Sequence, residues 1–178
     1  IIIGGGQQDA VLGLKALKAG KTCILICEGR ISEDRSREEF RNSGGTLLMG
    51  DKVKSVSWND ANTHVQSIYT ENFDSTPLSA DQYILCSGRF FTKGLLSDMD
   101  KIWEPVFGID LKYDADRANW CSQSFFDNQP FEQFGALTSP EWKALKQGKI
   151  IDNLYVAGEI LCDKQNNIEE LCRLFKSV

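Results

Sequence analysis

The sequence contains a single histidine, and its six cysteines form no CxxC pair. Zinc sites take most of their ligands from clustered cysteine and histidine, so no metal site is expected. Three of the cysteines, Cys23, Cys27 and Cys86, lie in apolar stretches, where a free thiol behaves as a small buried hydrophobe. That usage is typical of a protein in a reducing compartment.

Basic residues are also few: 20 Lys and Arg stand against 25 Asp and Glu, for a net charge of -5. A nucleic-acid partner requires clustered cations that neutralise phosphates, so none is expected. No apolar run approaches the roughly 20 residues that cross a bilayer, and no basic segment precedes the apolar start. We therefore expect a cytoplasmic chain without a membrane span, which would reach the inner face of the membrane only through partners.

The first part of the chain indicates a βαβ unit. Residues 1–3 are typical of a buried strand, an amphipathic helix follows a glycine turn and ends at Gly20, and residues 22–27 are a second buried strand. Such a unit is right-handed and contributes to a parallel sheet. With 178 residues, the chain is long enough for one domain with a full core.

The glycine turn of this unit is suited to binding phosphate. In Gly4-Gly5-Gly6, the first glycine permits the tight turn and the last lets backbone N–H groups approach a pyrophosphate at the helix N-terminus. Glu28 lies 22 residues after Gly6, where a carboxylate can accept hydrogen bonds from an adenosine ribose. These features predict an α/β, three-layer, Rossmann-like FAD/NAD(P)-binding domain. The alternative is a tight turn followed by an ordinary surface glutamate.

Asp9 stands where this fingerprint has its third glycine. A carboxylate in the first helical turn suits the dipole of an empty site, but it repels a pyrophosphate bound in the same field. We therefore expect the fold to be kept while the affinity for a nucleotide falls.

The middle of the chain is predicted to be partly antiparallel. Polar residues 31–43 indicate a surface helix or connector, and residues 46–49, 52–58 and 64–70 indicate a small antiparallel β-meander. Residues 89–140 are too apolar for a disordered linker and are expected to pack on the core as a cap. We expect one domain over residues 1–178.

Two further buried strands, residues 82–86 and 154–157, end at Ser87-Gly88 and at Gly158-Glu159. Parallel strands of an open sheet deliver their carboxyl ends to a ligand crevice. Arg89 follows directly and could meet a flavin phosphate, a substrate phosphate or a surface acid. A terminal amphipathic helix is expected from Ile168 onwards.

Four segments of the chain resemble one family in their order and spacing. Residues 87–95, 104–110, 129–135 and 152–158 are similar to segments of the B subunits of anaerobic glycerol-3-phosphate dehydrogenases. The resemblance implies a glutathione-reductase-like flavoprotein fold and a flavin cofactor, FMN or FAD. The residues expected to bind it are Gly4, Gly5, Gly6, Glu28, Gly29, Arg30, Ser87, Gly88, Arg89, Gly158 and Glu159.

The resemblance also implies a function within a complex. The partners would be the catalytic A subunit and the membrane-associated iron–sulfur C subunit, and the chain would relay electrons from glycerol 3-phosphate, oxidised to dihydroxyacetone phosphate, towards the quinone pool. A flavin suits this role because it takes up two electrons together and releases them singly. No histidine lies near the four segments to act as a base, so no catalytic residue is assigned and the chain is not expected to be active alone.

Two departures from the family leave an alternative open. The family has a long segment after the second strand, which is missing at the 30/31 junction, and residues 163–168 lack the glycines that precede the family's last helix. The alternative is a structural or assembly protein of the complex that keeps the fold but has lost its cofactor. A nicotinamide-dependent enzyme ranks last, because no second glycine fingerprint is present.

Overall fold

The computed structural model describes residues 1–29 and 35–174. Within them, the main sheet has the spatial order β11-β12-β6-β1-β2-β3, and all neighbours are parallel except β11 and β12. The strands of this sheet are β1 Ile2–Gly4, β2 Ile24–Cys27, β3 Thr46–Met49, β6 Tyr83–Cys86, β11 Lys143–Lys146 and β12 Lys149–Val156. The expected parallel α/β sheet is therefore confirmed.

The remaining strands form antiparallel pairs outside the main sheet. They are β4 Val53–Trp58 with β5 Val65–Thr70, β7 Leu96–Ser97 with β8 Ile102–Trp103, and β9 Leu111–Lys112 with β10 Gly135–Ala136. The α-helices are α1 Gln7–Lys18, α2 Arg35–Asn42 and α3 Ile168–Leu174. Short 3₁₀ helices cover Arg117–Asn119, Pro130–Gln133, Gly158–Ile160 and Cys162–Lys164.

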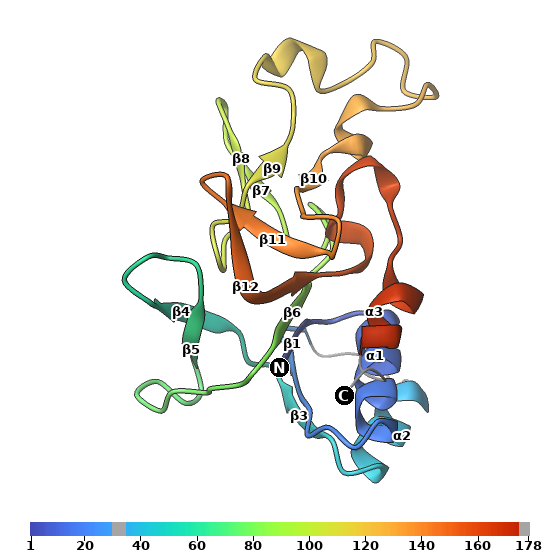
Figure 1. The fold of residues 1–178 in the computed structure, drawn as a ribbon. Helices are drawn as coiled ribbons and strands as arrows, with labels where there is room; N and C mark the ends of the chain where they lie inside the picture. The colour runs from blue at the N-terminus through green and yellow to red at the C-terminus, as the bar shows by residue number, and fades with distance from the viewer. Residues whose placement is uncertain (30–34, 175–178) are drawn as a thin grey trace.

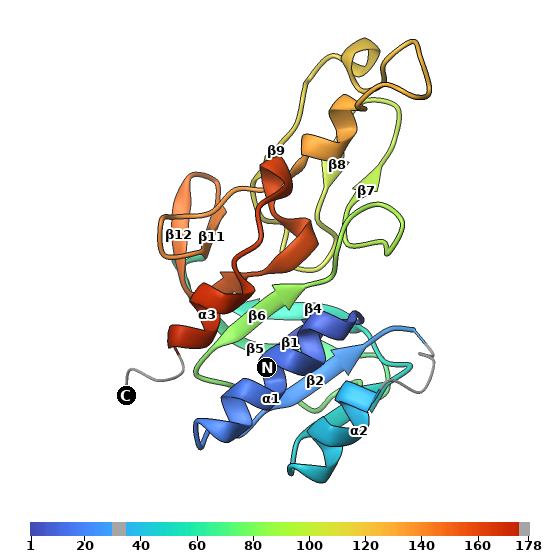
Figure 2. The same ribbon diagram turned by 90° about the vertical axis from the view of Figure 1, so that its right-hand side faces the viewer.

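The sheet separates two apolar layers. Ile2 and Leu25 belong to the layer on the helical side, whereas Ile3 and Ile26 belong to the layer on the other side. Successive strand residues point to opposite faces, so a continuous apolar run serves a sheet that is covered on both. Figures 1 and 2 show the helices α1, α2 and α3 on one face and the β4–β5 hairpin on the other. The three-layer architecture is confirmed.

Helix α2 is anchored by Phe40, whose side chain is fully buried. A Cβ atom at Gly13 of α1 would lie 2.6 Å from the Phe40 ring, and a Cβ at Gly45 would also lie within the ring's contact distance. The two glycines therefore make the space that the ring fills. This contact sets how closely α2 packs on the βαβ unit.

The predicted three-stranded meander is wrong in one strand. Residues 46–49 form β3, which joins the main sheet in parallel register with β2, Leu25 opposite Leu47. Helix α2 and the turn at Gly44, with φ 90°, return the chain to the sheet in a crossover connection. Only β4 and β5 pair as an antiparallel hairpin, which a bridge between Ile68 and Leu78 extends.

Residues 89–140 form the upper part of Figure 1, and part of this segment runs beside β11, where Thr138 forms an antiparallel bridge with Ala144. Tyr113, Trp120 and Phe134 pack edge to face, with ring centroids 6.2 to 6.4 Å apart. Inside this segment the buried Glu104 carboxylate accepts the N–H groups of residues 106, 107 and 108 at 2.9, 2.6 and 2.9 Å. That residues 89–140 are the cap of a single domain over residues 1–178 stays a prediction. The 30/31 junction lies outside the described residues.

Candidate functional site

Three turns that were expected to bind a cofactor lie at one edge of the sheet. Strand β1 pairs in parallel with β6, with Gly4 opposite Cys86, and β6 pairs in parallel with β12, with Leu85 opposite Val156. The carboxyl ends of neighbouring parallel strands lie at the same edge. The turns that follow these strands are Gly4-Gly5-Gly6, Ser87-Gly88 and Gly158-Glu159.

The glycine turn is tight and is occupied from inside by Asp9. A Cβ atom at Gly4 would lie 2.6 Å from the carbonyl oxygen of Cys86 and would overlap the Asp9 carboxylate, so only glycine fits there. Gly6 is the N-cap of α1, and its N–H donates to Asp9 Oδ2 at 2.7 Å. Asp9 is at the third helical position, from which an acidic side chain reaches back to the N-cap N–H.

The Asp9 side chain is 1% exposed. Burial raises the pKa of its carboxyl group from 3.8 to about 6, although the Cys86 thiol, the Gly6 N–H and the Arg37 guanidinium act in the opposite direction. Burial, followed by the nearby Asp9 charge, also raises the pKa of the Cys86 thiol. The turn therefore contains a carboxyl group that titrates close to neutral pH.

Arg37 of α2 is a cation at this turn that sequence reasoning missed. Its side chain is 5% exposed, and Nη2 donates to the carbonyl oxygens of Gly5 at 2.5 Å and Gly6 at 3.4 Å. Among the described residues, Nε and Nη1 have no hydrogen-bond partner. Buried guanidinium nitrogens without acceptors are rare, and they fit an anion at this position. An arginine in a polar helix gives no signal of burial in the sequence.

Glu28 and Gly29 follow β2, next to the glycine turn, and both are exposed. The Glu28 carboxylate is therefore accessible to a ribose hydroxyl, as the spacing predicts. Arg30, the third residue expected there, lies outside the described residues.

Arg89 links residues 89–140 to the turn that follows β12. Its Nε donates to the carbonyl oxygen of Glu159 at 2.5 Å, Nη2 donates to that of Leu161 at 2.9 Å, and Nη1 donates to that of Glu132. The neighbouring Ser87 carbonyl accepts the Thr92 hydroxyl at 2.7 Å. Three backbone acceptors occupy the guanidinium, so Arg89 has a structural role and its role in binding stays a prediction.

A groove of about 350 Å³ runs past the end of β12. Its lining residues are Gln8, Arg89, Gly158, Glu159, Lys164, Gln165 and Asn166. The buried Asn167 holds the turn in place, because its Oδ1 accepts the Gly158 N–H at 3.2 Å and its Nδ2 donates to the Val156 carbonyl at 2.8 Å. The groove therefore combines two cations, Arg89 and Lys164, which are both hydrogen-bonded within the chain, with the acidic Glu159.

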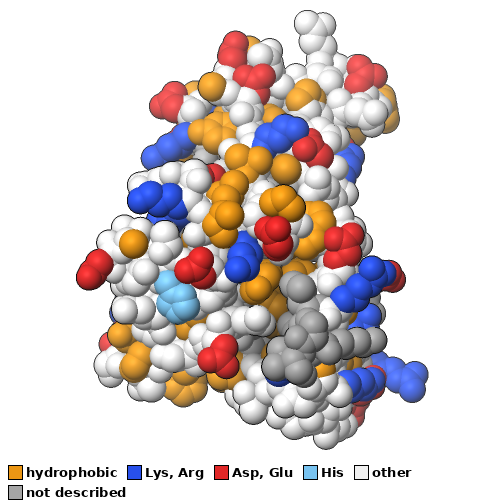
Figure 3. Space-filling model, viewed as in Figure 1, with side chains coloured by type: hydrophobic (Ala, Val, Ile, Leu, Met, Phe, Trp, Pro, Cys, Tyr) orange, Lys and Arg blue, Asp and Glu red, His pale blue; other side chains and the backbone are white. Residues whose placement is uncertain are grey.

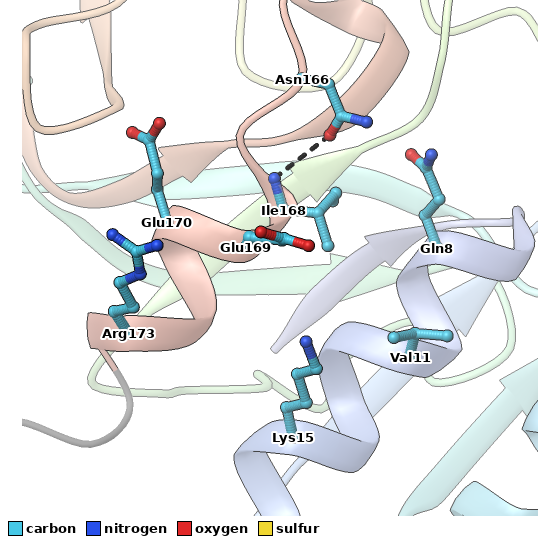
Figure 4. Close-up of a pocket in the computed structure, with 8 residues that line it drawn as sticks. All are labelled: Gln8, Val11, Lys15, Asn166, Ile168, Glu169, Glu170 and Arg173. Carbon is cyan, nitrogen blue, oxygen red and sulfur yellow. Dashed lines mark hydrogen bonds between the residues drawn. The ribbon is translucent and has the colours of Figure 1, made fainter.

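A second groove, of about 550 Å³, lies between α1 and α3 and shares Gln8 and Asn166 with the first. Figure 4 shows Lys15 on α1 across from Glu169 and Arg173 on α3. Its wall combines charges of both signs with Val11 and Ile168. On the molecular face in Figure 3, acidic and basic side chains are likewise interspersed.

The glycine-free stretch before α3 adopts the backbone that glycines would favour. Asp163 and Lys164 have φ values of 55° and 54°, in the left-handed region. Ion pairs fix both side chains, Asp163 with Lys112 at 2.7 Å and Lys164 with Glu132 at 2.6 Å. The absence of glycine thus leaves the turn in place but puts the Lys164 side chain in the lining of the groove.

The part of the chain that the structure describes has neither a metal cluster nor a spanning helix. No group of three or more His, Cys, Asp or Glu in residues 1–29 and 35–174 could hold a metal ion. None of the described helices is long and apolar enough to cross a membrane.

The hydrogen-bond donors at the sheet edge fit the phosphate of a flavin nucleotide. Only glycine fits at position 4, Arg37 has two unpartnered nitrogens at the turn, and the groove beside Gly158 contains Lys164. These groups suit a phosphate-bearing ligand. Two acids oppose such a ligand: the Asp9 carboxylate at the glycine turn and Glu159 in the lining of the groove.

Comparisons with known proteins agree with this geometry. A family described as FAD binding domain matches residues 29–173. The B subunit of anaerobic glycerol-3-phosphate dehydrogenase from Vibrio vulnificus (strain YJ016) is 40% identical over 131 residues, which cover 72% of this chain and 30% of that protein. The protein of the same name from Aliivibrio fischeri (strain MJ11) is 36% identical over 139 residues, with the same coverage.

The chain spans about 30% of the length of these curated relatives. Among solved structures, the GidA-related protein from Thermus thermophilus has a TM-score of 0.51 at 9% identity, with 97% of this chain and 92% of that chain covered. At such low identity the likeness concerns the fold alone. The family match covers most of the sequence, and the chain therefore belongs to the FAD binding domain family.

Proposed function

We propose that the chain is a flavin-binding electron-relay subunit, which holds FMN or FAD along the edge formed by the ends of β1, β6 and β12. The main support is the gathering of three turns, from distant parts of the sequence, beside a groove that contains Lys164. Gly4, Gly5 and Gly6 would face the phosphate, Glu28 and Gly29 the adenosine ribose of FAD, and Gly158 and Glu159 the flavin end. Ser87, Gly88 and Arg89 would form the floor between them.

A bound flavin supplies the ability to take up two electrons and release them one at a time. The residues of the chain would bind and orient it: N–H groups of the glycine turn donate to phosphate, and the tight backbone at Gly158 permits close approach. No described residue is assigned as an acid or base. We expect turnover to require a partner.

The resemblance to these relatives extends the proposal to a complex. We infer partners corresponding to a catalytic A subunit, which oxidises glycerol 3-phosphate to dihydroxyacetone phosphate, and a membrane-associated iron–sulfur C subunit, which passes electrons to the quinone pool. The chain would be cytoplasmic and peripheral at the inner face of the membrane through these partners. The names of the curated relatives support a multi-subunit setting.

Reconstitution tests the cofactor. Purified protein is incubated with FMN or with FAD, and retained visible flavin absorbance and the rise in melting temperature are measured. Glu28→Ala is expected to weaken FAD several-fold and leave FMN unchanged, because only FAD has the adenosine ribose. Glu38→Ala, an exposed acid on α2, is the matched control. No retention of either flavin, and no thermal shift, would contradict the proposal.

The second candidate is a structural or assembly protein of the complex without a cofactor. The observation that favours it is the Asp9 carboxylate, which accepts the Gly6 N–H that a phosphate would use. Co-expression with the two partner subunits separates the candidates. An assembly protein yields a complete complex that contains no flavin in this chain, whereas the relay yields a complex whose electron transfer is lost when this chain's flavin is removed.

A further inference from the structure

Two buried groups of opposite charge meet at the glycine turn without pairing with each other directly. Asp9 Oδ2 accepts the Gly6 N–H at 2.7 Å, and Arg37 Nη2 donates to the carbonyl oxygens of Gly5 and Gly6 at 2.5 and 3.4 Å. The carboxylate therefore binds the N–H side of the turn and the guanidinium binds its carbonyl side. Both side chains are at least nine-tenths buried.

Other titratable groups around Asp9 carry little compensating charge. The thiols of Cys86 on β6 and Cys27 on β2 interact with it, and burial raises the pKa of each thiol, so both are neutral near pH 7. Glu159, at the end of β12, acts on Cys86 and adds a second acid to this side. Arg37 is the one cation among the described groups that act on Asp9.

We infer that Asp9 is a built-in competitor for phosphate at the glycine turn: it takes the Gly6 N–H that a ligand phosphate needs, and Arg37 balances whichever anion, carboxylate or phosphate, is present. The inference rests on the proposed phosphate-binding role of this turn. It assigns Arg37 as a binding residue and makes the affinity of the turn depend on the charge of Asp9.

The dependence has a definite direction. Above a pH of about 6 the Asp9 carboxyl is ionised, repels phosphate and keeps the Gly6 N–H. Below that pH it is neutral, and a phosphate meets the α1 N-terminus and the unpartnered Arg37 nitrogens without an opposing charge. Binding of a ligand at pH 7.5 therefore includes the free-energy cost of protonating or displacing Asp9.

Inorganic pyrophosphate is the direct probe, measured by calorimetry at pH 7.5 and pH 5.0. Asp9→Asn removes the charge and leaves only a weaker, neutral acceptor for the Gly6 N–H. It should therefore bind at least about tenfold tighter than the unaltered chain at pH 7.5, because the Asp9 pKa of about 6 lies more than one unit below that pH. At pH 5.0 the two proteins should differ less than about twofold. Because each comparison is made at one pH, titration of pyrophosphate itself cancels.

Further variants give the controls. Asp60→Asn, in the exposed β4–β5 turn, should leave affinity unchanged at both pH values. Arg37→Gln in the Asp9→Asn background should lose most of the gained affinity, whereas Arg37→Lys should keep part of it because the charge remains. Melting curves of every variant establish that it is folded at the temperature of the binding experiment.

Each outcome bears on the inference. Equal affinity of the unaltered chain and Asp9→Asn at pH 7.5, or no pyrophosphate binding by either at both pH values, would overturn it. If Asp9→Asn binds pyrophosphate tightly but neither FMN nor FAD, the competitor stands and the proposed flavin role fails. If the unaltered chain binds FMN and Asp9→Asn binds it no tighter, the flavin role stands and the competitor fails.

Discussion

The body, which is the main sheet with helices α1, α2 and α3, and the predicted cap, residues 89–140, are stabilised in different ways. In the body, strands β1, β2 and β6 are joined by regular ladders of backbone hydrogen bonds, and their side chains fill apolar layers on both faces. In residues 89–140, by contrast, the ladders are two residues long. There, single side chains such as Glu104 and Gln129 accept or donate several backbone hydrogen bonds each.

A segment with little regular secondary structure needs side-chain partners for its buried backbone groups. Backbone groups that have no ladder must find other partners when they are buried. One carboxylate or amide can satisfy two or three of them, so stability is concentrated in a few polar side chains. In the body, stability is spread over many apolar contacts, and Phe40 is among the largest of the fully buried side chains.

The largest effect is expected for Phe40→Ala in the body. The ring is fully buried between Gly13 and Gly45, whose missing Cβ atoms leave no side chain to fill a cavity. We expect a loss of about 3–5 kcal/mol in the free energy of unfolding, measured by urea denaturation. Phe73→Ala, at a side chain that is 44% exposed, is the control and should change little. A loss below about 1 kcal/mol for Phe40→Ala would mean that α2 is not held by this contact.

The next largest effect is a gain, and it concerns a polar group inside the body. Burial raises the pKa of Asp9 above its unfolded value, so its contribution to stability is fully present below pH 4 and is lost as pH rises through about 6. A shift from 3.8 to about 6 corresponds to about 3 kcal/mol. Asp9→Asn should therefore stabilise the chain by up to about 3 kcal/mol at pH 7.5 and far less at pH 4.5.

Urea denaturation of both proteins at the two pH values measures this difference, and titration of all other groups cancels between them. A gain that is equal at pH 4.5 and 7.5 would show that Asp9 is not an ionised buried group.

The sequence predicts the body better than the cap for the same physical reason. Apolar runs and the glycine turn are local patterns, and they predicted β1, α1, β2, β6 and the end of β12. The partner of residues 46–49 is not a local property: the parallel pairing of Leu47 with Leu25 depends on how α2 packs, so the predicted meander was wrong there.

The candidate site divides in the same way. Gly4, Ser87 and Gly158 stand at or near the ends of strands, and their common edge could be predicted because parallel strands align their carboxyl ends. Arg37 could not be found, because in a helix as polar as α2 an arginine is most often solvated. The hydrogen bond from Gly6 to Asp9 likewise depends on the depth of the turn, which spacing alone does not determine.

A moderate effect is expected for Glu104→Gln in the cap. The carboxylate oxygens accept three backbone N–H groups, and an amide can accept only through its single oxygen. At least one buried N–H is left without an acceptor, so we expect a loss of about 2 kcal/mol in the free energy of unfolding. Glu71→Gln, in an exposed ion pair with Lys52, is the control and should leave the free energy of unfolding almost unchanged. Equal losses for the two variants would mean that the Glu104 hydrogen bonds stabilise the cap no more than an exposed ion pair does.

The smallest effect is expected at the tip of the cap, for Gln129→Ala. The Gln129 side chain accepts the Ser122 N–H at 3.0 Å and donates to the carbonyl oxygens of Ser124 and Asp127, both at 2.9 Å. These bonds are largely exposed, so their loss should cost about 1 kcal/mol or less overall. It should nevertheless speed hydrogen exchange in residues 122–128 alone, as measured by mass spectrometry. Phe126→Ala, at a side chain that is 95% exposed, should leave exchange unchanged, and faster exchange in both variants would mean that contacts beyond Gln129 order the tip.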